Sequence, residues 1–468
     1  MEYRIESDSL GDMEVPKSAW YGCQTQRAIE NYPISGLRHE GVFIRAFVYL
    51  KKAAALANAE LSAITREQGD AIAKACDEVL REGKWMDQFV VDVFQMGAGT
   101  SFHMNVNEVL ANRANVLMGG NLGEYDRVNP NNHVNFGQST NDAFPTAMRL
   151  AVLMATRDSL HPVLLKFEKA LREKGHEFDD ILKSARTHLQ DAVPIRLGQE
   201  FTAYAEAIRK CHVCVDVARL SCAELGIGGS AAGTGLNTAP GYRERILEIL
   251  QEETGISELK PARDMREAMQ SQRPMAEMSA SLRNLALEVG RICNDLRLLS
   301  SGPTTGLAEI DLPAVAPGSS IMPGKVNPSM LEMMNMVCFQ VVGCDATISQ
   351  AVAAGQLELN VMMPVMQFNV LFAIRILSNG LEQLRARCIE GITAKPERCK
   401  RYAEGSMGLA TALNPSIGYA NAARLAKQAL AENRPIPEIV RELKIMSDED
   451  LKRVLDPIKM TEPGIPGE

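Results

Sequence analysis

The hydrophobic positions of this chain repeat at the spacing of long helices. In four segments, apolar residues recur at alternating steps of three and four, which places them along one side of an α-helix. The four segments cover residues 201–225, 278–296, 330–341 and 370–384. An average spacing of about 3.5 residues is typical of long helices that pack nearly parallel. We therefore predict a helical bundle, with a further helical stretch over residues 146–183.

Flexible and polar stretches separate these helical segments. Residues 226–235 are rich in Gly, Ala and Ser, residues 313–328 in Gly, Pro and Ser, and residues 129–138 are polar and turn-like. We predict a mainly α fold of three domains. A mixed, mostly helical N-terminal domain covers 1–139, a central helical bundle 140–396, and a small C-terminal helical domain 397–468. The β-structure is expected to be minor and near the N-terminus, where residues 13–16 and 20–22 alternate weakly.

Composition narrows the class of protein. The chain is 46% hydrophobic and 23% charged, as ordinary globular proteins are. Aromatic residues make up only 5% against 23 methionines, which favours packed helices over a β-sandwich. The 58 acidic residues outnumber the 50 basic ones. This balance argues against nucleic acid as a partner and against attachment to an anionic membrane surface.

The cysteines and the apolar runs indicate the cellular compartment in which the protein is expected. Ten cysteines lack the spacing of a disulfide framework, and the first residues contain no apolar signal core. No uninterrupted apolar run reaches the roughly 18 residues that a membrane-spanning helix needs. We therefore expect a soluble, cytoplasmic protein with free thiols. Residues 211–214 have the spacing Cys-His-Val-Cys but lack the further ligands of a structural zinc site, so no metal is expected.

Three polar segments are candidates for chemistry. Residues 318–328 (Gly-Ser-Ser-Ile-Met-Pro-Gly-Lys-Val-Asn-Pro) place two hydroxyls, a cation and an amide in one flexible loop. In residues 185–191, His188 stands beside Thr, Arg and Asp, which suits anion binding or proton transfer. Residues 137–142 place Ser, Thr and Asn before a helix, where they either cap it or hold a carboxylate. Taken singly, each segment is also consistent with a plain structural role.

Together the segments resemble the aspartase/fumarase superfamily. Residues 318–328 resemble its signature, in the form Gly-Ser-Ser-x-x-Pro-x-Lys-x-Asn-Pro. Residues 97–108, 137–142, 185–194 and 233–237 resemble its other blocks, in the family's order, so that the likeness covers essentially the whole chain. The resemblance implies the aspartase/fumarase-type three-domain fold, with a central long-helix bundle and a homotetrameric core. It also implies active sites assembled from several subunits, and no metal or organic cofactor.

The resemblance further implies a reaction. Members of the family add ammonia or water across fumarate, or remove it again. A proton must leave a carbon beside a carboxylate, and the negative charge then moves onto that carboxylate to give an aci-carboxylate intermediate. Such a site needs a base with access to the carbon and fixed hydrogen-bond donors where the charge develops. The expected partner is therefore a small dicarboxylate substrate.

Roles for individual residues follow from the same resemblance. Ser319 is the expected base, and Lys325 and nearby N–H groups would stabilise its alkoxide. Asn141, with His188 nearby, is expected to face the leaving amine or hydroxyl, and Glu332 is expected to support His188. The remaining residues hold the two carboxylates: Thr100, Ser139, Thr140 and Ser320 hold the one that gains charge, and Thr187, His188, Lys325 and Asn327 hold the other.

The nucleophile is predicted from smaller similarities. Residues 139–142, 292–303, 355–360 and 460–467 resemble the ammonia-lyases of the family more than its hydratases. They predict the reversible deamination of L-aspartate to fumarate and ammonia. A class II fumarate hydratase acting on L-malate stays open as the alternative, because Thr140 differs from the usual Ser of fumarases by one methyl group. Thr304 and Met363 stand where relatives carry Arg and Glu. A non-catalytic helical scaffold would show gaps in the three segments, whereas every assigned polar position is filled.

Overall fold

The computed structural model describes residues 2–468, which form two compact units. Unit 1 contains the chain up to Pro162, His212–Ala286 and Phe339–Ser378. Unit 2 contains Val163–Cys211, Leu287–Cys338 and Asn379–Glu468. Each unit is therefore built from segments that lie far apart in the sequence. The division into three domains expected from the sequence stays a prediction.

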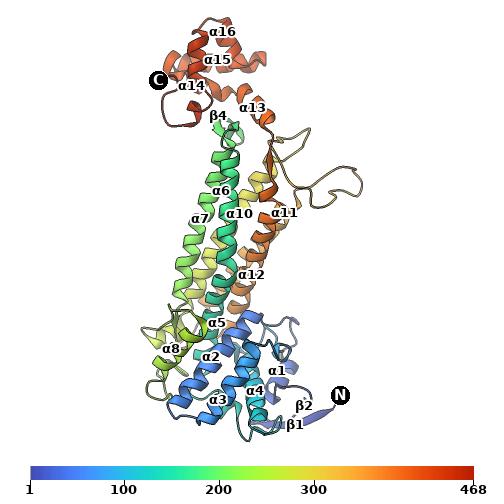
Figure 1. Ribbon diagram of the computed structural model, residues 1–468, viewed down its shortest axis with the longest axis vertical. Helices are drawn as coiled ribbons and strands as arrows, with labels where there is room; N and C mark the ends of the chain where they lie inside the picture. Colours follow the sequence, from blue (N-terminus) through green and yellow to red (C-terminus); the bar gives the residue numbers. More distant parts are fainter. Residues whose placement is uncertain (1) are drawn as a thin grey trace. The chain divides into compact units, whose positions relative to one another are not determined.

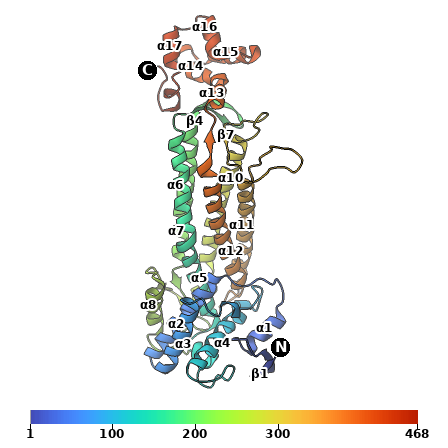
Figure 2. The ribbon, with the colours of Figure 1, turned by 45° about the vertical axis from the view of Figure 1, so that its right-hand side comes forward.

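Five long helices dominate both views of the chain (Figures 1 and 2). They are α6 (His161–Glu177), α7 (Leu197–Ser221), α10 (Arg273–Leu299), α11 (Ser329–Ala353) and α12 (Met363–Arg387). The predicted apolar stripes on α7, α10 and α12 are buried, from Phe201 to Ala218, from Met278 to Leu296 and from Val370 to Leu384. The prediction of a mainly α protein with long helices is confirmed.

The apolar stripe of α11 agrees with the predicted one only in part. Of the predicted positions, Met334 and Val341 are buried, whereas Met330, Met333 and Val337 are only half-buried. The buried side also contains Leu331 and Cys338, which the spacing did not predict. The helix is apolar on a second side as well, where Met336 and Phe339 are exposed. Because both sides are apolar, spacing alone does not distinguish the side that packs within the chain.

The same helix is the one described segment long and apolar enough to cross a membrane, by length and composition. The criterion of an uninterrupted apolar run misses it, because polar residues stand within it. Two of these polar residues are buried and hydrogen-bonded to α10. Asn335 donates to the carbonyl of Gly290 at 3.3 Å, and Asp345 accepts from the hydroxyl of Ser279 at 2.7 Å. Such internal pairing is typical of a helix that packs against other helices in a protein.

Unit 1 has an aromatic core between three helices. Its other helices are α1 (Cys23–Asn31), α2 (Gly41–Glu60), α3 (Arg66–Leu80), α4 (Thr100–Leu117), α5 (Thr140–Ala155), α8 (Tyr242–Thr254) and α9 (Met265–Gln270). The ring of Phe43 on α2 lies 5.3 Å from that of Phe102 on α4 and 5.1 Å from that of Phe144 on α5. These contacts hold the beginnings of α4 and α5 against α2.

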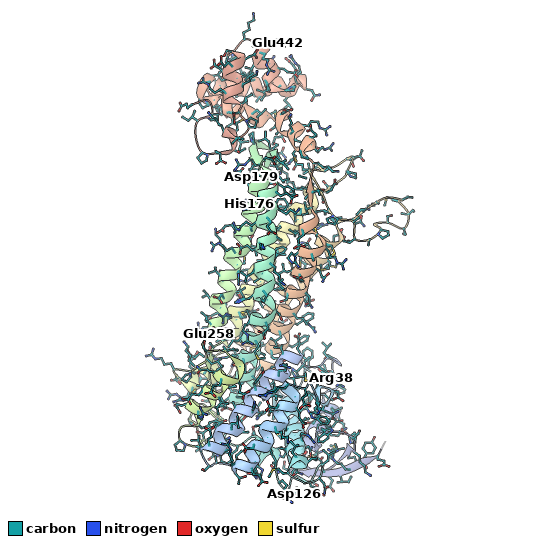
Figure 3. The ribbon with its side chains drawn as sticks, viewed as in Figure 1. Arg38, Asp126, His176, Asp179, Glu258 and Glu442 are labelled. Atoms are coloured by element: carbon teal, nitrogen blue, oxygen red, sulfur yellow. The ribbon has the colours of Figure 1, made fainter. Side chains whose placement is uncertain are left out.

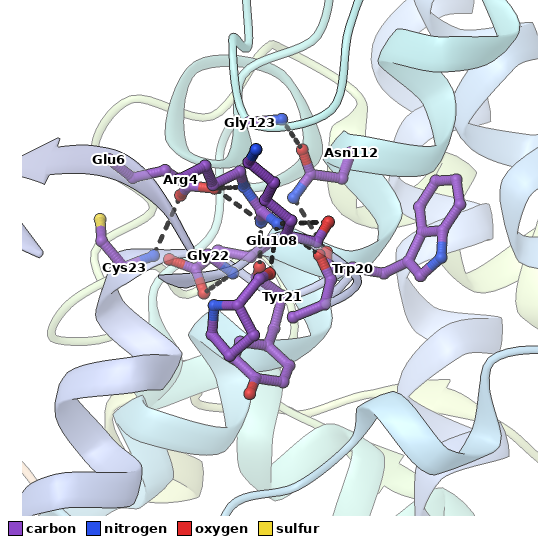
Figure 4. Close-up of polar contacts among 12 residues, drawn as sticks. Arg4, Glu6, Trp20, Tyr21, Gly22, Cys23, Glu108, Asn112 and Gly123 are labelled. Carbon is purple, nitrogen blue, oxygen red and sulfur yellow. Dashed lines mark hydrogen bonds and ion pairs between the residues drawn. The ribbon is translucent and has the colours of Figure 1, made fainter. Parts of the chain in front are cut away.

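The N-terminal segment is attached to α4 by a buried carboxylate (Figure 4). Strand β1 (Tyr3–Asp8) pairs with β2 (Gly11–Pro16), and α1 follows. Glu108 on α4 accepts hydrogen bonds from the backbone N–H groups of Gly22, Gln24 and Thr25 at 2.9–3.1 Å. Burial raises the pKa of Glu108 to about 7, and the hydrogen bonds from Thr25 and its neighbours oppose that shift. The beginning of α1 is thus fixed to the helix that carries Thr100.

The β-structure is minor, as predicted, but only part of it is near the N-terminus. Residues 13–16 lie in β2, whereas residues 20–22 form no strand. Further pairs are β3 (Leu182–Thr187) with β4 (Gln190–Arg196), β5 (Glu224–Leu225) with β6 (Lys260–Pro261), and β7 (Ile310–Asp311) with β8 (Thr393–Ala394). The predicted helix over 146–183 is therefore wrong at its end. It divides at a π-helical turn, Thr156–Leu160, and α6 ends at Glu177, because the polar residues that follow Phe178 lead into β3.

The C-terminal helices of unit 2 share a small apolar core. They are α13 (Pro396–Gly405), α14 (Ala410–Ile417), α15 (Tyr419–Glu432), α16 (Ile436–Glu442) and α17 (Asp448–Val454). Leu413, Leu425, Ile439 and Leu451 are buried together in this core. Charged side chains cover the outside of both units. Those labelled in Figure 3 are all exposed: Arg38, Asp126, His176, Asp179, Glu258 and Glu442.

Candidate functional site

The polar segment at residues 137–142 begins helix α5. The hydroxyl of Ser139 accepts the N–H of Asn141 at 3.2 Å, and the carboxylate of Asp142 accepts the N–H of Ser139 at 2.9 Å. Ser139 and Asp142 together form a capping box, in which each side chain accepts the backbone N–H of the other residue. Thr140 and Asn141 follow as the first two helical residues, both half-buried. They lie at the positive end of the helix dipole, where a carboxylate is favoured.

Asp142 also joins the glycine-rich loop at 226–235 to this helix. Its second oxygen accepts the N–H groups of Gly228 at 3.1 Å and Ser230 at 2.9 Å. Burial raises the pKa of Asp142 to about 7, while these N–H donors act in the opposite direction. From the same loop, the carbonyl of Ala231 accepts the side-chain amide of Asn141 at 2.8 Å. The loop therefore fixes the orientation of Asn141.

Thr100 is the first residue of α4 and lies near the same region of unit 1. Gly99, which precedes it, has a left-handed φ of 86°. A Cβ atom at Gly99 would lie 2.1 Å from the ring of Phe144 on α5. Only glycine permits this approach, so the beginnings of α4 and α5 lie together.

A buried chain of polar groups leads from Lys51 through His103 to Thr140. The Nδ1 of His103 lies 2.7 Å from the Oγ1 of Thr140, and its Nε2 lies 2.6 Å from the Nζ of Lys51. We did not predict a role for either residue from the sequence. One signal was present, because Lys51 stands in the apolar run of α2, where a charged residue is rarely buried without a partner.

Thr187 and His188 lie at the tip of the β3–β4 hairpin in unit 2. Thr187 pairs with Gln190, and the two residues between them have φ values of 57° for His188 and 59° for Leu189. Two positive φ values in a two-residue loop are typical of a type I′ turn. Both Thr187 and His188 are exposed. The hairpin thus presents the imidazole to solvent within this chain.

The base of this hairpin is held by a buried carboxylate. Glu309 is fully buried and forms ion pairs with Lys183 at 3.1 Å and Arg186 at 2.9 Å. Both cations belong to β3, which leads directly to the turn. These ion pairs therefore hold the base of the hairpin in place, while its tip is exposed to solvent.

The loop over residues 318–328 is closed at its base. The N–H of Gly318 donates to the carbonyl of Lys325 at 2.8 Å, and the amide of Asn327 donates to the carbonyl of Gly318 at 2.7 Å. A Cβ atom at Gly318 would lie 2.3 Å from the carbonyl oxygen of Lys325, so only glycine fits there. Within the loop, the Oγ of Ser319 accepts the N–H groups of Ile321 at 3.2 Å and Met322 at 3.0 Å.

The predicted site residues are divided between the two units. Thr100, Ser139, Thr140 and Asn141 belong to unit 1. The hairpin tip and the loop at 318–328 belong to unit 2, where Ser320 and Lys325 are exposed, and Asn327 and Glu332 are half-buried. Among residues 2–468, no hydrogen bond or ion pair joins the hairpin tip to the loop. In the same described part of the chain, no cluster of three His, Cys, Asp or Glu side chains is placed to hold a metal ion.

The two positions that depart from relatives lie outside these groups. Met363 is fully buried at the beginning of α12, and its Sδ lies 3.8 Å from the side-chain amide of Gln272. Thr304 is exposed in the segment between α10 and β7.

Comparisons with known proteins cover the whole chain. Residues 11–343 match the family model described as Lyase, and residues 409–462 match the model described as Fumarase C C-terminus. The aspartate ammonia-lyase of Bacillus sp is 47% identical over 466 residues, which are 100% of this chain and 99% of that protein. The aspartate ammonia-lyase of Bacillus subtilis is 45% identical and covers 100% of this chain and 98% of its own length.

Solved structures agree with these matches. A fumarate lyase:delta crystallin from Brucella melitensis superposes with a TM-score of 0.95 at 45% identity, over 99% of this chain and 100% of that one. A class II fumarase from Schistosoma mansoni superposes with the same TM-score of 0.95 at 35% identity, and covers 99% of this chain and 100% of its own.

Proposed function

Since the chain belongs to the lyase family of aspartases and fumarases and is a carbon–nitrogen lyase, we propose that it converts L-aspartate reversibly to fumarate and ammonia with the residue groups described above. Support for ammonia comes from full-length relatives. The curated proteins from Corynebacterium glutamicum, Pseudomonas aeruginosa and Helicobacter pylori are 44–46% identical, and each is an aspartate ammonia-lyase. The solved fumarase is less similar, at 35% identity.

One observation supports Ser319 as the base. A serine hydroxyl is too weakly acidic to be a base at neutral pH unless its alkoxide is stabilised. The Oγ of Ser319 already accepts two backbone N–H groups, from Ile321 and Met322. The hydrogen bonds from these donors would strengthen as negative charge develops on the oxygen. Lys325, on the same loop, would add a positive charge. The alkoxide then takes the proton from the carbon beside the carboxylate, and the C–N bond breaks in the following step.

The hydroxyl groups of unit 1 suit the carboxylate that gains charge. The oxygen of Ser139 accepts the N–H of Asn141, so its own proton stays available for a ligand. The Oγ1 of Thr140 lies 2.7 Å from the Nδ1 of His103. Thr100 adds a third hydroxyl at the adjacent helix N-terminus, and Ser320 of the loop a fourth. Fixed donors of this kind stabilise an aci-carboxylate more than the ground state, which is how they lower the barrier.

The remaining residues are assigned to the second carboxylate and to the amine of the substrate. We assign the second carboxylate to Thr187, His188, Lys325 and Asn327, with Glu332 as a support for His188. Asn141 has its amide nitrogen engaged with the carbonyl of Ala231. Its side-chain carbonyl is then the group left to accept a hydrogen bond from a substrate ammonium.

A homotetramer would bring the separate groups together. On α11, the side chains of Met336 and Phe339 are 64% and 69% exposed, which is unusual for large apolar residues in adjacent helical turns. We assign this side of α11 to contacts with other copies of the chain, which would complete each site. A cytoplasmic location fits the free thiols in the described part of the chain, such as Cys76 and Cys399, since such thiols persist in a reducing compartment.

A side-by-side assay tests the proposal. Purified protein is incubated with L-aspartate or with L-malate, and fumarate is followed by its ultraviolet absorbance, with ammonia measured in parallel. Turnover of L-aspartate with release of ammonia supports the proposal. Turnover of L-malate alone would replace it with the fumarate hydratase alternative, and turnover of neither would favour a non-catalytic scaffold.

A further inference from the structure

We propose that Lys51 and His103 are positioning residues that fix the hydroxyl of Thr140 as a hydrogen-bond donor toward the substrate carboxylate. The proposal rests on the function proposed above, in which Thr140 contacts that carboxylate. The proposal explains why the hydroxyl proton of Thr140 points toward the substrate. Both residues lie in unit 1 and are buried, with Lys51 at 0% and His103 at 1% exposure.

The argument begins with the protons of Lys51. Its Nζ has three acceptors within hydrogen-bond distance. They are the Nε2 of His103 at 2.6 Å, the Oδ1 of Asn135 at 3.1 Å and the Oε1 of Gln138 at 2.8 Å. An ammonium group carries three protons and no acceptor, so it satisfies all three partners at once.

The orientation of the two amides supports this assignment independently. The amide nitrogen of Gln138 donates to the carbonyls of Val134 at 3.1 Å and Phe136 at 3.2 Å. The amide nitrogen of Asn135 donates to the carbonyl of Gln138 at 3.4 Å. Each amide therefore has its NH₂ group engaged elsewhere and turns its oxygen toward Lys51. The oxygens, unlike the nitrogens, accept hydrogen bonds.

The tautomer of His103 follows. Because Lys51 donates to Nε2, that nitrogen carries no proton, and a neutral imidazole then has its proton on Nδ1. This N–H points at the Oγ1 of Thr140, 2.7 Å away. The oxygen of Thr140 is thus an acceptor for His103, and its own proton is directed elsewhere. In the opposite tautomer, the hydroxyl would donate to Nδ1 and have no proton left for a substrate carboxylate.

The surroundings keep this arrangement stable. Burial lowers the pKa of His103 well below its usual value, and the neighbouring charge of Lys51 acts in the same direction, while a hydrogen bond with Asn135 opposes them, so the imidazole stays neutral. Burial also lowers the pKa of Lys51 well below its usual value, while the charges of Asp142 and Cys76 act in the opposite direction. The three oriented acceptors favour the ammonium form, as does the ring of Phe47, whose centroid lies 5.9 Å from the Nζ.

Two substitutions at His103 separate its two hydrogen bonds. In His103→Asn, the side-chain amide occupies the place of Nδ1 and still donates to Thr140, but Lys51 loses a partner. In His103→Gln, the amide oxygen reaches the place of Nε2 and still accepts from Lys51, but nothing donates to Thr140. We expect His103→Gln to lower kcat for L-aspartate by about 10²-fold, as the loss of one fixed donor does, with a smaller change in KM. We expect His103→Asn to retain kcat within about fivefold of the wild type.

The outcomes are distinct. A His103→Gln enzyme with wild-type kcat would overturn the proposal, and so would equal losses of kcat in the two variants at matched unfolding temperatures. If His103→Gln does not fold, Lys51→Met gives a second test, because Met has a similar length but cannot donate to Nε2. Its kcat should fall as in His103→Gln, and an unchanged kcat would again overturn the proposal. The affinity of each variant for fumarate, measured by calorimetry, compares the variants without turnover. A wild-type protein that is inactive on L-aspartate would therefore refute the proposed function, and the comparison of fumarate affinities would still test the role of His103.

Discussion

The carboxylate of Asp142 accepts the backbone N–H of Ser230 at 2.9 Å, although 88 residues separate the two along the chain. The same carboxylate accepts the N–H of Ser139 at the beginning of α5. One buried side chain therefore joins a helix N-terminus to a glycine-rich loop. Because Asn141 donates to the same loop, the position of this candidate substrate-binding residue depends on Asp142.

We predict that Asp142→Asn lowers both stability and substrate affinity. Every hydrogen bond that Asp142 accepts comes from a backbone N–H, so the NH₂ group of Asn would face a donor. Leaving such groups unsatisfied costs about 1–3 kcal/mol, which should lower the midpoint of thermal unfolding. The KM for L-aspartate should rise, because Asn141 loses its anchored loop. Asp70→Asn, at an exposed ion pair with Arg66, is the matched control, and an equal change in both variants would contradict the argument.

The pKa of Glu108 leads to a prediction about pH. Its folded-state pKa is raised from 4.5 to about 7, so the folded protein holds this proton where the unfolded chain has lost it. The contribution of Glu108 to the unfolding free energy is therefore fully present below about pH 4.5 and is lost as the pH rises to about 7. Since Gln does not titrate, Glu108→Gln should be more destabilised relative to the wild type at pH 5 than at pH 8. Thermal unfolding at both values checks this, and a difference that stays constant or grows with pH would contradict it.

The closed base of the loop over residues 318–328 predicts an effect of Gly318→Ala. The added Cβ would meet the carbonyl of Lys325 at 2.3 Å and force the base of the loop open. We expect kcat to fall by about tenfold or more, because small displacements of reacting groups are costly, while the unfolding temperature changes little. Gly324→Ala is the control in the same loop. Its φ of 80° disfavours Ala, but nothing lies within 4 Å of the added atom, so its loss of kcat should be smaller.

The exposed apolar side of α11 predicts the effect of Phe339→Glu. If this side packs against other copies, a buried carboxylate there should dissociate the assembly, and the separated subunits should lose activity because their sites are incomplete. Light scattering after size-exclusion chromatography gives the mass, and the fumarate assay gives the activity. Gln340→Glu, at an exposed polar position on the same helix, should leave both unchanged. A Phe339→Glu protein with wild-type mass and activity would contradict the proposed interface.

Sequence periodicity predicted the long helices, and the stripes on α7, α10 and α12 are buried as expected. On α11 the two apolar sides make the spacing ambiguous. The predicted helix over 146–183 extended too far, because no Gly or Pro marks the end of α6 near residues 178–181.

The candidate site was predictable only where its residues are contiguous. The segments at 137–142, 185–191 and 318–328 each contain their chemistry within a few residues. The pair Lys51 and His103 was not predictable, because their hydrogen bond joins α2 to α4 across 52 residues. The role proposed for this pair depends on how the side-chain amides of Asn135 and Gln138 are oriented, and only the folded chain provides that orientation.

The role of Ser319 is the central claim, and Ser319→Ala tests it most directly. Removing the hydroxyl removes the group that accepts the proton from carbon, so kcat for L-aspartate should fall by about 10²–10⁴-fold, the usual contribution of a general base. The KM should change little, because the groups assigned to the two carboxylates remain, and the exposed loop predicts an unchanged unfolding temperature. A Ser319→Ala enzyme that deaminates L-aspartate at the wild-type rate would contradict the account.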